Sequence, residues 1–192
     1  MGVEGGGGNG GPGGLPLCPD DLGDAPDSFG TLRASGGAFH TQNPINAVRL
    51  GLTVDTEPDG QPSPHAWGDL NPDEDGLVGS DVHAGGASSI TVRTTGVALL
   101  QAWIDFNQNG IWGPGEQVAT NMGLGTGITV IPITVAAGAV LGPTYMRMRY
   151  STNIGVMSGG AATDGEVEDH AVRICPPTPD CCRRVAFVVD LS

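Results

Sequence analysis

The residues from Asp105 to Glu116 have the types and spacing needed to hold a divalent cation. The stretch DFNQNGIWGPGE follows the pattern D-x-N-x-N-G, then five residues and a Glu. A twelve-residue calcium loop places oxygen donors at positions 1, 3, 5, 7 and 12, because the ion takes roughly 6 to 8 oxygens from a chain curled around it. Gly110 stands at the sixth position, where a sharp turn favours a residue without Cβ. The predicted ligands are Asp105, Asn107, Asn109, Ile111 through its backbone carbonyl, and Glu116.

The segments that flank this loop predict that it is the tip of a β-hairpin. VALLQAWIDF, before the loop, is rich in strand formers, and QVATNMGLGTG, after it, is too short and too Gly-rich for a helix. In an EF-hand the residue at position 12 binds calcium with both carboxylate oxygens because it begins a helix. No helix is expected after Glu116, so the prediction rests mainly on Asp105, Asn107 and Asn109. The alternative is an ordinary Asn/Asp/Gly turn between two strands, which has a similar composition.

The other acidic residues gather in packets beside Gly, Pro or Asn. The packets cover residues 20–27, 55–59, 69–75 and 164–169. Packed carboxylates repel one another unless a cation lies among them, so the distribution predicts several calcium ions or one site assembled from several loops. A set of polar turns is the competing interpretation. The further candidate ligands are Asp55, Glu57, Asp73, Asp75, Asp164, Glu166, Glu168 and Asp169.

The run DGEVED precedes the last strand-like segment, EVEDHAVRI. In a strand, Glu166 and Glu168 share one face and Asp169 lies on the other, so that two carboxylates can reach a common ion. A solvated edge strand accounts equally well for the spacing. The four histidines are scattered and lack the spacing of ligands or of a catalytic triad, which predicts structural or surface roles for them.

The composition excludes several classes of protein. The chain of 192 residues has no Lys and a net charge of −13, which argues against nucleic acid and anionic membranes as partners and favours cations. The sequence has no apolar run of roughly 18 residues that could span a bilayer, and its N-terminus lacks the apolar region of a signal peptide. Export information is therefore expected outside this sequence, or the sequence is a piece of a longer protein.

Gly and Pro together predict an all-β fold, because 33 Gly and 15 Pro leave little room for helices. Short strand-like runs such as ASSITVRT, GITVIPITV and TYMRMRYS follow one another from Ala87 onward. In TYMRMRYS the apolar Met146, Met148 and Tyr150 alternate with Tyr145, Arg147 and Arg149. Five to eight such strands predict a β-sandwich of jelly-roll or Ig-like type with long acidic calcium-binding loops.

Three regions are expected along the chain. Residues 1–17 form a flexible Gly-rich linker, residues 18–175 form the β-sandwich domain, and residues 176–192 form a linker with Pro and Cys. Four cysteines allow three pairings, of which Cys18 with Cys175 would join the two ends of the domain. Cys181 and Cys182 are adjacent and are expected to pair elsewhere or with a neighbouring chain. The absence of C-x-x-C argues against zinc.

Five motifs in this order resemble the GEVED family of bacterial extracellular and surface proteins. They are DLGDAPDSFGT, VDTEPDGQP with DEDGL, AWIDFNQNGIWGPGEQV, MRMRYS and DGEVED. The resemblance covers roughly residues 21–174 and implies a β-sandwich module, stabilised by calcium and without established catalysis, in large secreted proteins. The sequence departs from the family at Asn71-Pro72, where an acid is usual, and at His170, where Tyr is common.

The end of the chain resembles the first strand of a von Willebrand factor A domain. RRVAFVVDLS has a basic pair, an apolar strand and Asp-x-Ser, but it includes only Asp190 and Ser192 of the adhesion motif of that domain. A plain terminal strand explains these residues as well.

The expected function is that of a non-catalytic, calcium-stabilised structural or adhesion-supporting module of a larger secreted or cell-surface bacterial protein. Neighbouring domains would contact glycans or proteins. The alternative is a calcium-dependent carbohydrate-binding module in which exposed Trp67 or Trp112 stacks on a sugar. Paired carboxylates also serve glycosidases, but carboxylates within Asn/Gly loops suit a cation better than a general acid, so no enzyme activity is expected.

Overall fold

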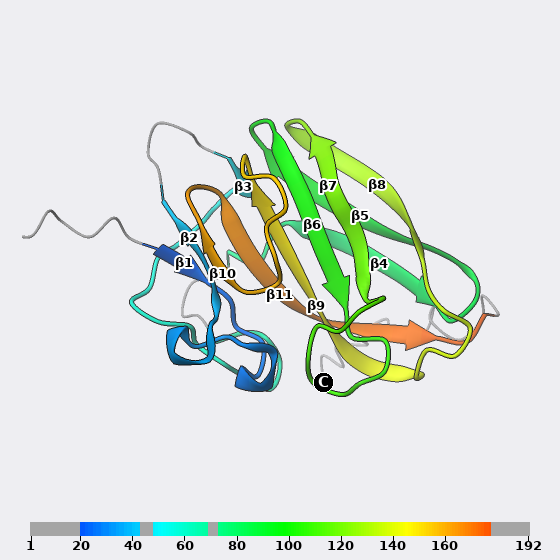
Figure 1. Cartoon of the computed structure of the whole chain (residues 1–192). Coiled ribbons are helices and arrows are strands. Elements are labelled where there is room, and N and C mark those ends of the chain that lie inside the picture. Colours follow the sequence, from blue (N-terminus) through cyan, green and yellow to red (C-terminus); the bar gives the residue numbers. More distant parts are fainter. Residues whose placement is uncertain (1–19, 43–47, 69–72, 178–192) are drawn as a thin grey trace, which may run out of the picture.

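The protein is built almost entirely of β-strands (Figure 1). The computed structural model describes residues 20–42, 48–68 and 73–177. Its only helical elements within these ranges are two short 3-10 turns, η1 (Asp27–Phe29) and η2 (Arg33–Ser35). Neither turn approaches the length or apolar character of a helix that crosses a membrane. The predicted all-β class is confirmed.

Two sheets pack face to face in a sandwich-like arrangement. In the first sheet the strand order is β11-β9-β6-β7, and every neighbouring pair is antiparallel. In the second, β5 pairs with β8 along one edge and with β4 and β3 along the other. A short parallel pairing of β4 with β11 joins the two sheets. The strands are β3 (Arg49–Leu50), β4 (Leu77–His83), β5 (Ala87–Thr95), β6 (Ala98–Ile104), β7 (Gln117–Leu124), β8 (Gly127–Thr134), β9 (Gly142–Ser151) and β11 (Glu166–Cys175).

The hydrophobic core fills the space between these two sheets. Ile90 of β5 and Leu100 of β6 are fully buried in it. The alternation predicted for β9 is confirmed on this side, because Met146, Met148 and Tyr150 all belong to the core. Burial of such side chains removes apolar surface from water, which is the main favourable contribution to folding.

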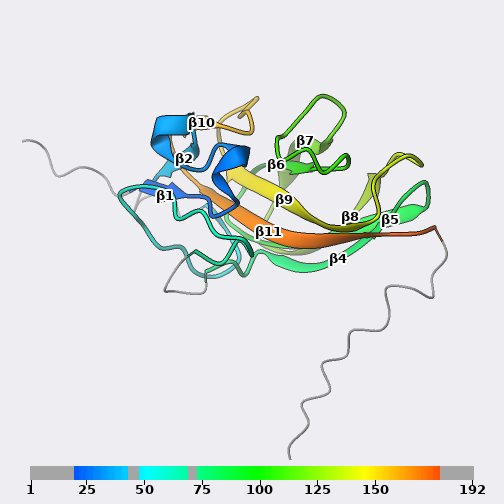
Figure 2. The same cartoon turned by 90° about the horizontal axis from the view of Figure 1, so that it is seen from below.

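A third, smaller sheet covers the other side of β9 and β11. It consists of β1 (Asp20–Leu22), β2 (Ala38–Thr41) and β10 (Gly160–Ala162), in the order β1-β2-β10. Figure 2 shows β2 and β10 on the side of β9 opposite β4 and β5. The side chains of Arg147 and Arg149 are fully buried beneath this layer. The polar face of β9 is therefore covered by protein.

The structure confirms the predicted hairpin and adds strands that the sequence pattern did not reveal. Residues 105–116 connect β6 to β7, which are antiparallel partners. Strands β1, β2, β4 and β10 lie in segments for which no strand is predicted. The predicted linker 1–17 and the tail 178–192, with Asp190 and Ser192, lie outside the described residues.

Candidate metal centre

One edge of β11 is not covered by a neighbouring strand along the GEVED residues. β9 pairs with β11 from Glu166 to Ile174, whereas β4 pairs with it only at Ile174 and Cys175. Side chains take the place of a strand at this edge. The amide of Val167 donates to Oδ2 of Asp21 at 2.7 Å, and Oε1 of Glu168 accepts the amide of Gly76 at 2.9 Å.

Carboxylates from four segments converge at this edge of β11. Asp21, Asp55 and Glu57 form one group, and Asp21, Asp73 and Glu166 form a second, each with ligand oxygens that lie within 4.8 Å of one another. Asp21 belongs to both groups. The backbone supports the first group, because the amide of Glu57 donates to the carbonyl of Asp20 at 2.9 Å. We call these five residues the carboxylate cluster.

Several carboxylate oxygens of the cluster are buried without a hydrogen-bond donor. Glu166 is 1% exposed, and within the described ranges neither of its oxygens accepts a hydrogen bond of normal geometry. Asp73 is 5% exposed; its Oδ2 accepts the amide of Asp55 at 2.8 Å, but its Oδ1 has no such partner among the described residues. Buried polar atoms are normally hydrogen-bonded, so these oxygens need a proton, a water molecule or a cation.

The electrostatics of the cluster disfavour its negative charge. Burial, followed by the charge of Glu57, raises the pKa of Asp21 well above its usual value. Burial, followed by the charges of Glu168, Asp21 and Asp73, raises the pKa of Glu166, and the backbone of Leu50 offsets only part of this. Burial and the neighbouring Asp55 raise the pKa of Asp73 to about 6. A divalent cation would reverse these shifts.

A third acidic group lies next to the cluster on β11. Glu74, Glu168 and His170 have ligand atoms within 4.8 Å of one another. Nε2 of His170 lies 2.8 Å from Oε2 of Glu168 and 3.7 Å from Oε2 of Glu74. Burial, followed by the charge of Glu168, raises the pKa of Glu74 well above its usual value. The imidazole of His170 therefore lies close to both carboxylates of this group, whereas the carboxylate cluster contains no imidazole.

Asp169 forms a buried ion pair and is not part of these acidic groups. Its two oxygens accept Nε and Nη2 of Arg147, both at 2.7 Å, and both side chains are fully buried. Oδ2 also accepts the amides of Asp24 and Ala25 at 2.9 and 2.8 Å. Burial alone would raise the pKa of Asp169, but the charge of Arg147 outweighs it and the pKa is lowered. This pair ties the DLGDAP segment to β9 and β11.

Two more predicted ligands serve as hydrogen-bond acceptors away from these groups. Asp164 accepts the hydroxyl of Ser151 at 2.6 Å and the amide of Thr152 at 2.9 Å. Asp75 accepts the amide of Leu52 at 2.9 Å and lies 3.8 Å from Arg93. Of the eight acids predicted outside the hairpin loop, the structure therefore brings Asp55, Glu57, Asp73, Glu166 and Glu168 into acidic groups and places Asp75, Asp164 and Asp169 elsewhere.

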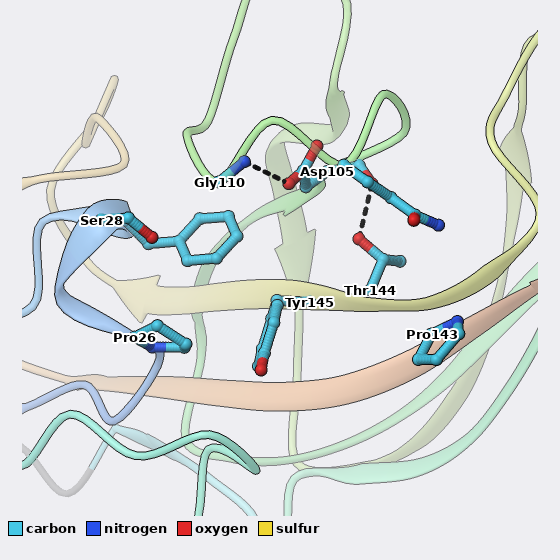
Figure 3. A pocket seen from close by; sticks show the side chains of 9 residues that line it. Pro26, Ser28, Asp105, Gly110, Pro143, Thr144 and Tyr145 are labelled. Atoms are coloured by element: carbon cyan, nitrogen blue, oxygen red, sulfur yellow. Dashed lines mark hydrogen bonds between the residues drawn. The ribbon is translucent and has the colours of Figure 1, made fainter.

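The hairpin loop curls around its own carboxylates. Asp105 is 1% exposed and Glu116 is 3% exposed. Asp105 accepts the amide of Gly110 at 2.9 Å (Figure 3) and that of Asn109 at 3.2 Å. Glu116 reaches back across the loop to accept the amides of Phe106 and Asn107 at 3.0 and 3.4 Å. The first and twelfth positions thus face the inside of the loop.

The middle positions of the loop form turns within the loop itself. Oδ1 of Asn107 accepts the amide of Asn109 at 3.0 Å, and Oδ1 of Asn109 accepts the amide of Ile111 at 3.1 Å. All three residues are exposed. Such bonds from Asn to a backbone amide two residues on stabilise an ordinary turn as well as a metal loop. Both interpretations of this stretch therefore stay open.

Trp112 packs the loop against the N-terminal segment. Its ring lies 4.5 Å from that of Phe29, and the guanidinium of Arg147 lies 5.6 Å from the Trp112 centroid. Trp112 is only partly exposed, whereas Trp67 is 77% exposed. Of the two tryptophans predicted as sugar-stacking residues, Trp67 has the freer ring.

A cavity of about 200 Å³ lies between the hairpin loop and η1. Its walls include Asp105 and Tyr145, which are labelled in Figure 3, and also Phe29 and Gln108. The hydroxyl of Thr144 donates to the carbonyl of Asp105 at 2.6 Å and fixes the start of the loop at this wall. The cavity therefore combines aromatic rings with polar groups.

The cysteines are only partly within the described residues. Cys175 is disulfide-bonded, and Cys18, Cys181 and Cys182 lie outside the described residues. The predicted Cys18–Cys175 pairing stays a prediction, because Cys18 lies outside the described residues.

Sequence reasoning missed Asp21, Glu74 and His170 as members of the acidic groups. Asp21 and Glu74 lie within two of the acidic packets, but nothing local distinguishes them from their neighbours. His170 is two residues from Glu168, a spacing that places both on one face of a strand and could have indicated their contact.

The comparison with protein families gives one match, the GEVED domain, over residues 99–173. No curated protein and no solved structure matches the chain. The matched residues run from β6 into β11 and include the hairpin loop, Arg147 and the GEVED residues themselves. The resemblance seen in the sequence is confirmed over this range, because residues 99–173 match the GEVED domain.

Proposed function

We propose that this chain is a non-catalytic module held together by calcium, and that it serves as a structural or adhesion-supporting unit of a larger secreted or cell-surface protein. Calcium prefers carboxylate, carbonyl and water oxygens, which are what the carboxylate cluster and the hairpin loop offer. Free calcium is in the millimolar range outside cells, where weak sites are filled.

The observation that carries the proposal is the burial of the Glu166 carboxylate without an ion pair. Glu166 is 1% exposed and, in the described part of the chain, its carboxylate has no ion pair and accepts no hydrogen bond of normal geometry. Asp21 and Asp73, which lie beside it, also lack an ion pair with any described residue. A buried charge of this kind is costly unless it is paired, and a divalent cation is the partner that suits several carboxylates at once.

Thermal unfolding with and without calcium tests the proposal. Chelator should lower the melting temperature, and millimolar calcium should restore it. A ligand at 100 times its Kd stabilises the folded state by about 2.7 kcal/mol, which corresponds to roughly 5 to 11 °C for a domain of this size. A melting curve that neither chelator nor calcium moves would remove the calcium role.

Matched variants identify the residues responsible. Glu166→Gln should abolish most of the calcium-dependent shift in melting temperature. Asp81→Asn should retain the full shift, because the side chain of Asp81 is 66% exposed on β4 and lies in none of the acidic groups. Equal shifts in both variants would place the bound calcium elsewhere.

Burial is also the reason for proposing that the carboxylates are not catalytic. A glycosidase needs two acids about 5 to 9.5 Å apart that both reach a substrate. Glu166 and Glu168 are each 1% exposed, and a sugar cannot reach them in this conformation. Hydrolysis assays on polysaccharides are expected to show no activity.

Carbohydrate binding is a second candidate function, favoured by the cavity beside the hairpin loop. Aromatic rings and polar groups in one cavity suit a sugar, which has an apolar face and a hydroxylated rim. The cavity is lined by the rings of Phe29 and Tyr145 and by the polar Gln108 and Asp105. A glycan array with wild type, Tyr145→Ala and Trp67→Ala decides between the cavity, the exposed Trp67 and no binding.

A further inference from the structure

We propose that the carboxylate cluster holds two calcium ions and that Asp21 bridges them. The inference rests on the proposed function and specifies the site that performs it. One ion would lie among Asp21, Asp55 and Glu57, and the other among Asp21, Asp73 and Glu166.

The distances within each group suit a single calcium ion. Calcium–oxygen distances are about 2.3 to 2.6 Å, so two oxygens on opposite sides of one ion lie about 4.6 to 5.2 Å apart. The ligand oxygens within each of the two groups lie within 4.8 Å of one another. One ion can therefore contact all three residues of a group.

The same distances argue against one ion for the whole cluster. The five residues do not form one set with all ligand atoms within 4.8 Å; they form two sets that share only Asp21. A carboxylate has two oxygens with several lone pairs, so it can contact an ion on each side. Oδ2 of Asp21 accepts one hydrogen bond, from Val167, and retains a further lone pair.

The count of charges leads to the same number of ions. The cluster contains five carboxylates, Asp21, Asp55, Glu57, Asp73 and Glu166. One calcium ion would leave three negative charges in a buried site, whereas two would leave one. Buried charge is costly, so the second ion is favoured by the same energetics as the first.

The second group has oxygens ready for coordination. Both oxygens of Glu166 and Oδ1 of Asp73 are buried and accept no hydrogen bond of normal geometry from a described residue. These atoms lie where Glu166 and Asp73 come within reach of Asp21, so one cation could contact all three residues. Waters or backbone carbonyls would complete the coordination of each ion.

Counting bound calcium in variants tests this arrangement. Native mass spectrometry and isothermal titration on the whole chain give the number of ions in wild type, Glu57→Gln, Glu166→Gln and the double variant. The difference between wild type and double variant counts only ions of the cluster, so an ion in the hairpin loop does not affect it. The expected difference is two, with one ion lost in each single variant.

Asp21→Asn tests the bridge itself. This variant should weaken both sites, with at least a tenfold higher Kd for each, whereas Asp81→Asn on exposed β4 should leave the titration unchanged. If Asp21→Asn weakens only one site, the bridging role is wrong. If each single variant and the double variant all bind one ion fewer than wild type, the cluster holds a single ion.

The experiments distinguish failure of the two-ion site from failure of the proposed calcium role. A difference of one ion overturns the two-ion site but leaves calcium stabilisation in place. No bound calcium in wild type, together with a melting temperature unaffected by chelator, removes the proposed function as well. Folding is checked in chelator, where the Gln variants should melt at the same temperature as wild type or higher, because each removes repulsion between buried carboxylates.

Discussion

Glu166 and Asp169 are three residues apart in one strand, yet their carboxylates have opposite surroundings. Asp169 is held by Arg147 and two backbone amides, whereas Glu166 has neighbours of its own charge. The difference arises because side chains alternate across a strand, so that Asp169 faces the arginine side of β9 and Glu166 does not. The acidic residues of one motif therefore divide into a structural anchor and a candidate ligand.

Breaking the buried ion pair should be among the most destabilising single changes. Asp169→Asn removes the charge opposite Arg147, which has no exposure to water, and is expected to cost about 3 to 5 kcal/mol of unfolding free energy. Urea denaturation measures this value. Arg33→Ala is the control, because its pair with Asp20 is partly exposed and should contribute about 1 kcal/mol or less. Similar losses in both variants would contradict the account.

Gly165, the first residue of the GEVED run, is expected to tolerate no side chain. Its φ is +89°, and a Cβ would lie 1.8 Å from the carbonyl oxygen of Tyr150. Gly165→Ala should lower stability by about 3 kcal/mol or more, from backbone strain and overlap together. Gly155→Ala separates the two effects, because Gly155 has φ +70° but open space around it, and should cost about 1 kcal/mol. Equal melting temperatures for the two variants would show that contact between a Cβ at position 165 and the carbonyl oxygen of Tyr150 adds no cost.

The acidic packets predicted that acids distant in the sequence would meet, but not which acids meet one another. Asp55, Glu57, Asp73 and Glu166 are brought together as the calcium hypothesis requires, although that hypothesis itself stays a prediction. Nothing in the local sequence distinguishes Asp169 as the partner of Arg147, because the two are 22 residues apart. The role of each acid depends on long-range pairing, which residue spacing does not encode.

The covering sheet is joined to β9 by a polar contact between β2 and an arginine. Arg149 donates to Nε2 of His40 at 2.9 Å, and Nδ1 of His40 faces the carbonyl of Asp164 at 2.6 Å. Burial, followed by the charge of Arg147, lowers the pKa of Arg149 to about 9, while the charges of Asp21 and Asp169 oppose this. Burial and the neighbouring Arg149 also lower the pKa of His40 well below its usual value. His40 is therefore neutral in the folded protein.

Because His40 is neutral when buried under the covering sheet, the folded protein should be less stable in acid. The unfolded chain takes up a proton at His40 near pH 6.5, but the folded chain does so only at lower pH. Its contribution to stability is complete above pH 6.5 and falls by about 1.4 kcal/mol per pH unit below it. Unfolding free energies of wild type and His40→Gln, measured from pH 5 to 8, should differ with this slope. His65→Gln on the exposed surface should follow wild type.

Glu116 allows the two interpretations of the hairpin loop to be separated. As an acceptor of backbone amides it stabilises the loop without metal, so Glu116→Gln should cost about 1 to 2 kcal/mol in chelator. If Glu116 also binds calcium, the loss should be larger when calcium is saturating. Thermal unfolding in both conditions measures this, and equal losses would leave the loop as an ordinary turn.

The strands found from the sequence are those with a regular pattern. β5, β8, β9 and β11 show β-branched or alternating residues, and the structure confirms them. β4, LVGSDVH, was missed because it contains Gly and Asp and its residues from Val78 to Asp81 are all exposed. β1, β2 and β10 have three or four residues each, which is too short for any periodicity. Their pairing depends on the strands that they cover.

At the scale of the molecule, a sandwich with its own hydrophobic core carries a covering layer held mainly by polar contacts. The core joins β5, β6, β8 and β9. The covering layer meets β11 where Asp21 accepts the amide of Val167 and where Asp169 accepts the amides of Asp24 and Ala25, and it meets β9 at the buried Arg149. Calcium in the carboxylate cluster would fasten the layer to the sandwich. Removal of calcium should therefore loosen the covering layer more than the sandwich.

Hydrogen exchange with and without calcium should reveal this difference. Chelation is expected to speed exchange at least tenfold, equivalent to about 1.4 kcal/mol, in residues 20–24, 55–57, 73–76 and 166–169. The amides of β6 and β7 should be nearly unaffected, because their pairing lies away from the cluster. Uniform acceleration over the whole chain would show that the layer and the sandwich unfold as one unit.

The positions of the first and last described strands have a mechanical consequence. β1 lies at one end of the molecule and the C-terminal end of β11 at the other (Figure 1). Tension applied through these two ends would pull β11 lengthwise and load its hydrogen bonds with β9 in shear, so that all of them resist at once. Asp21 of β1 accepts the amide of Val167 of β11, so an ion bound by Asp21 would add resistance to the separation of these two strands under load.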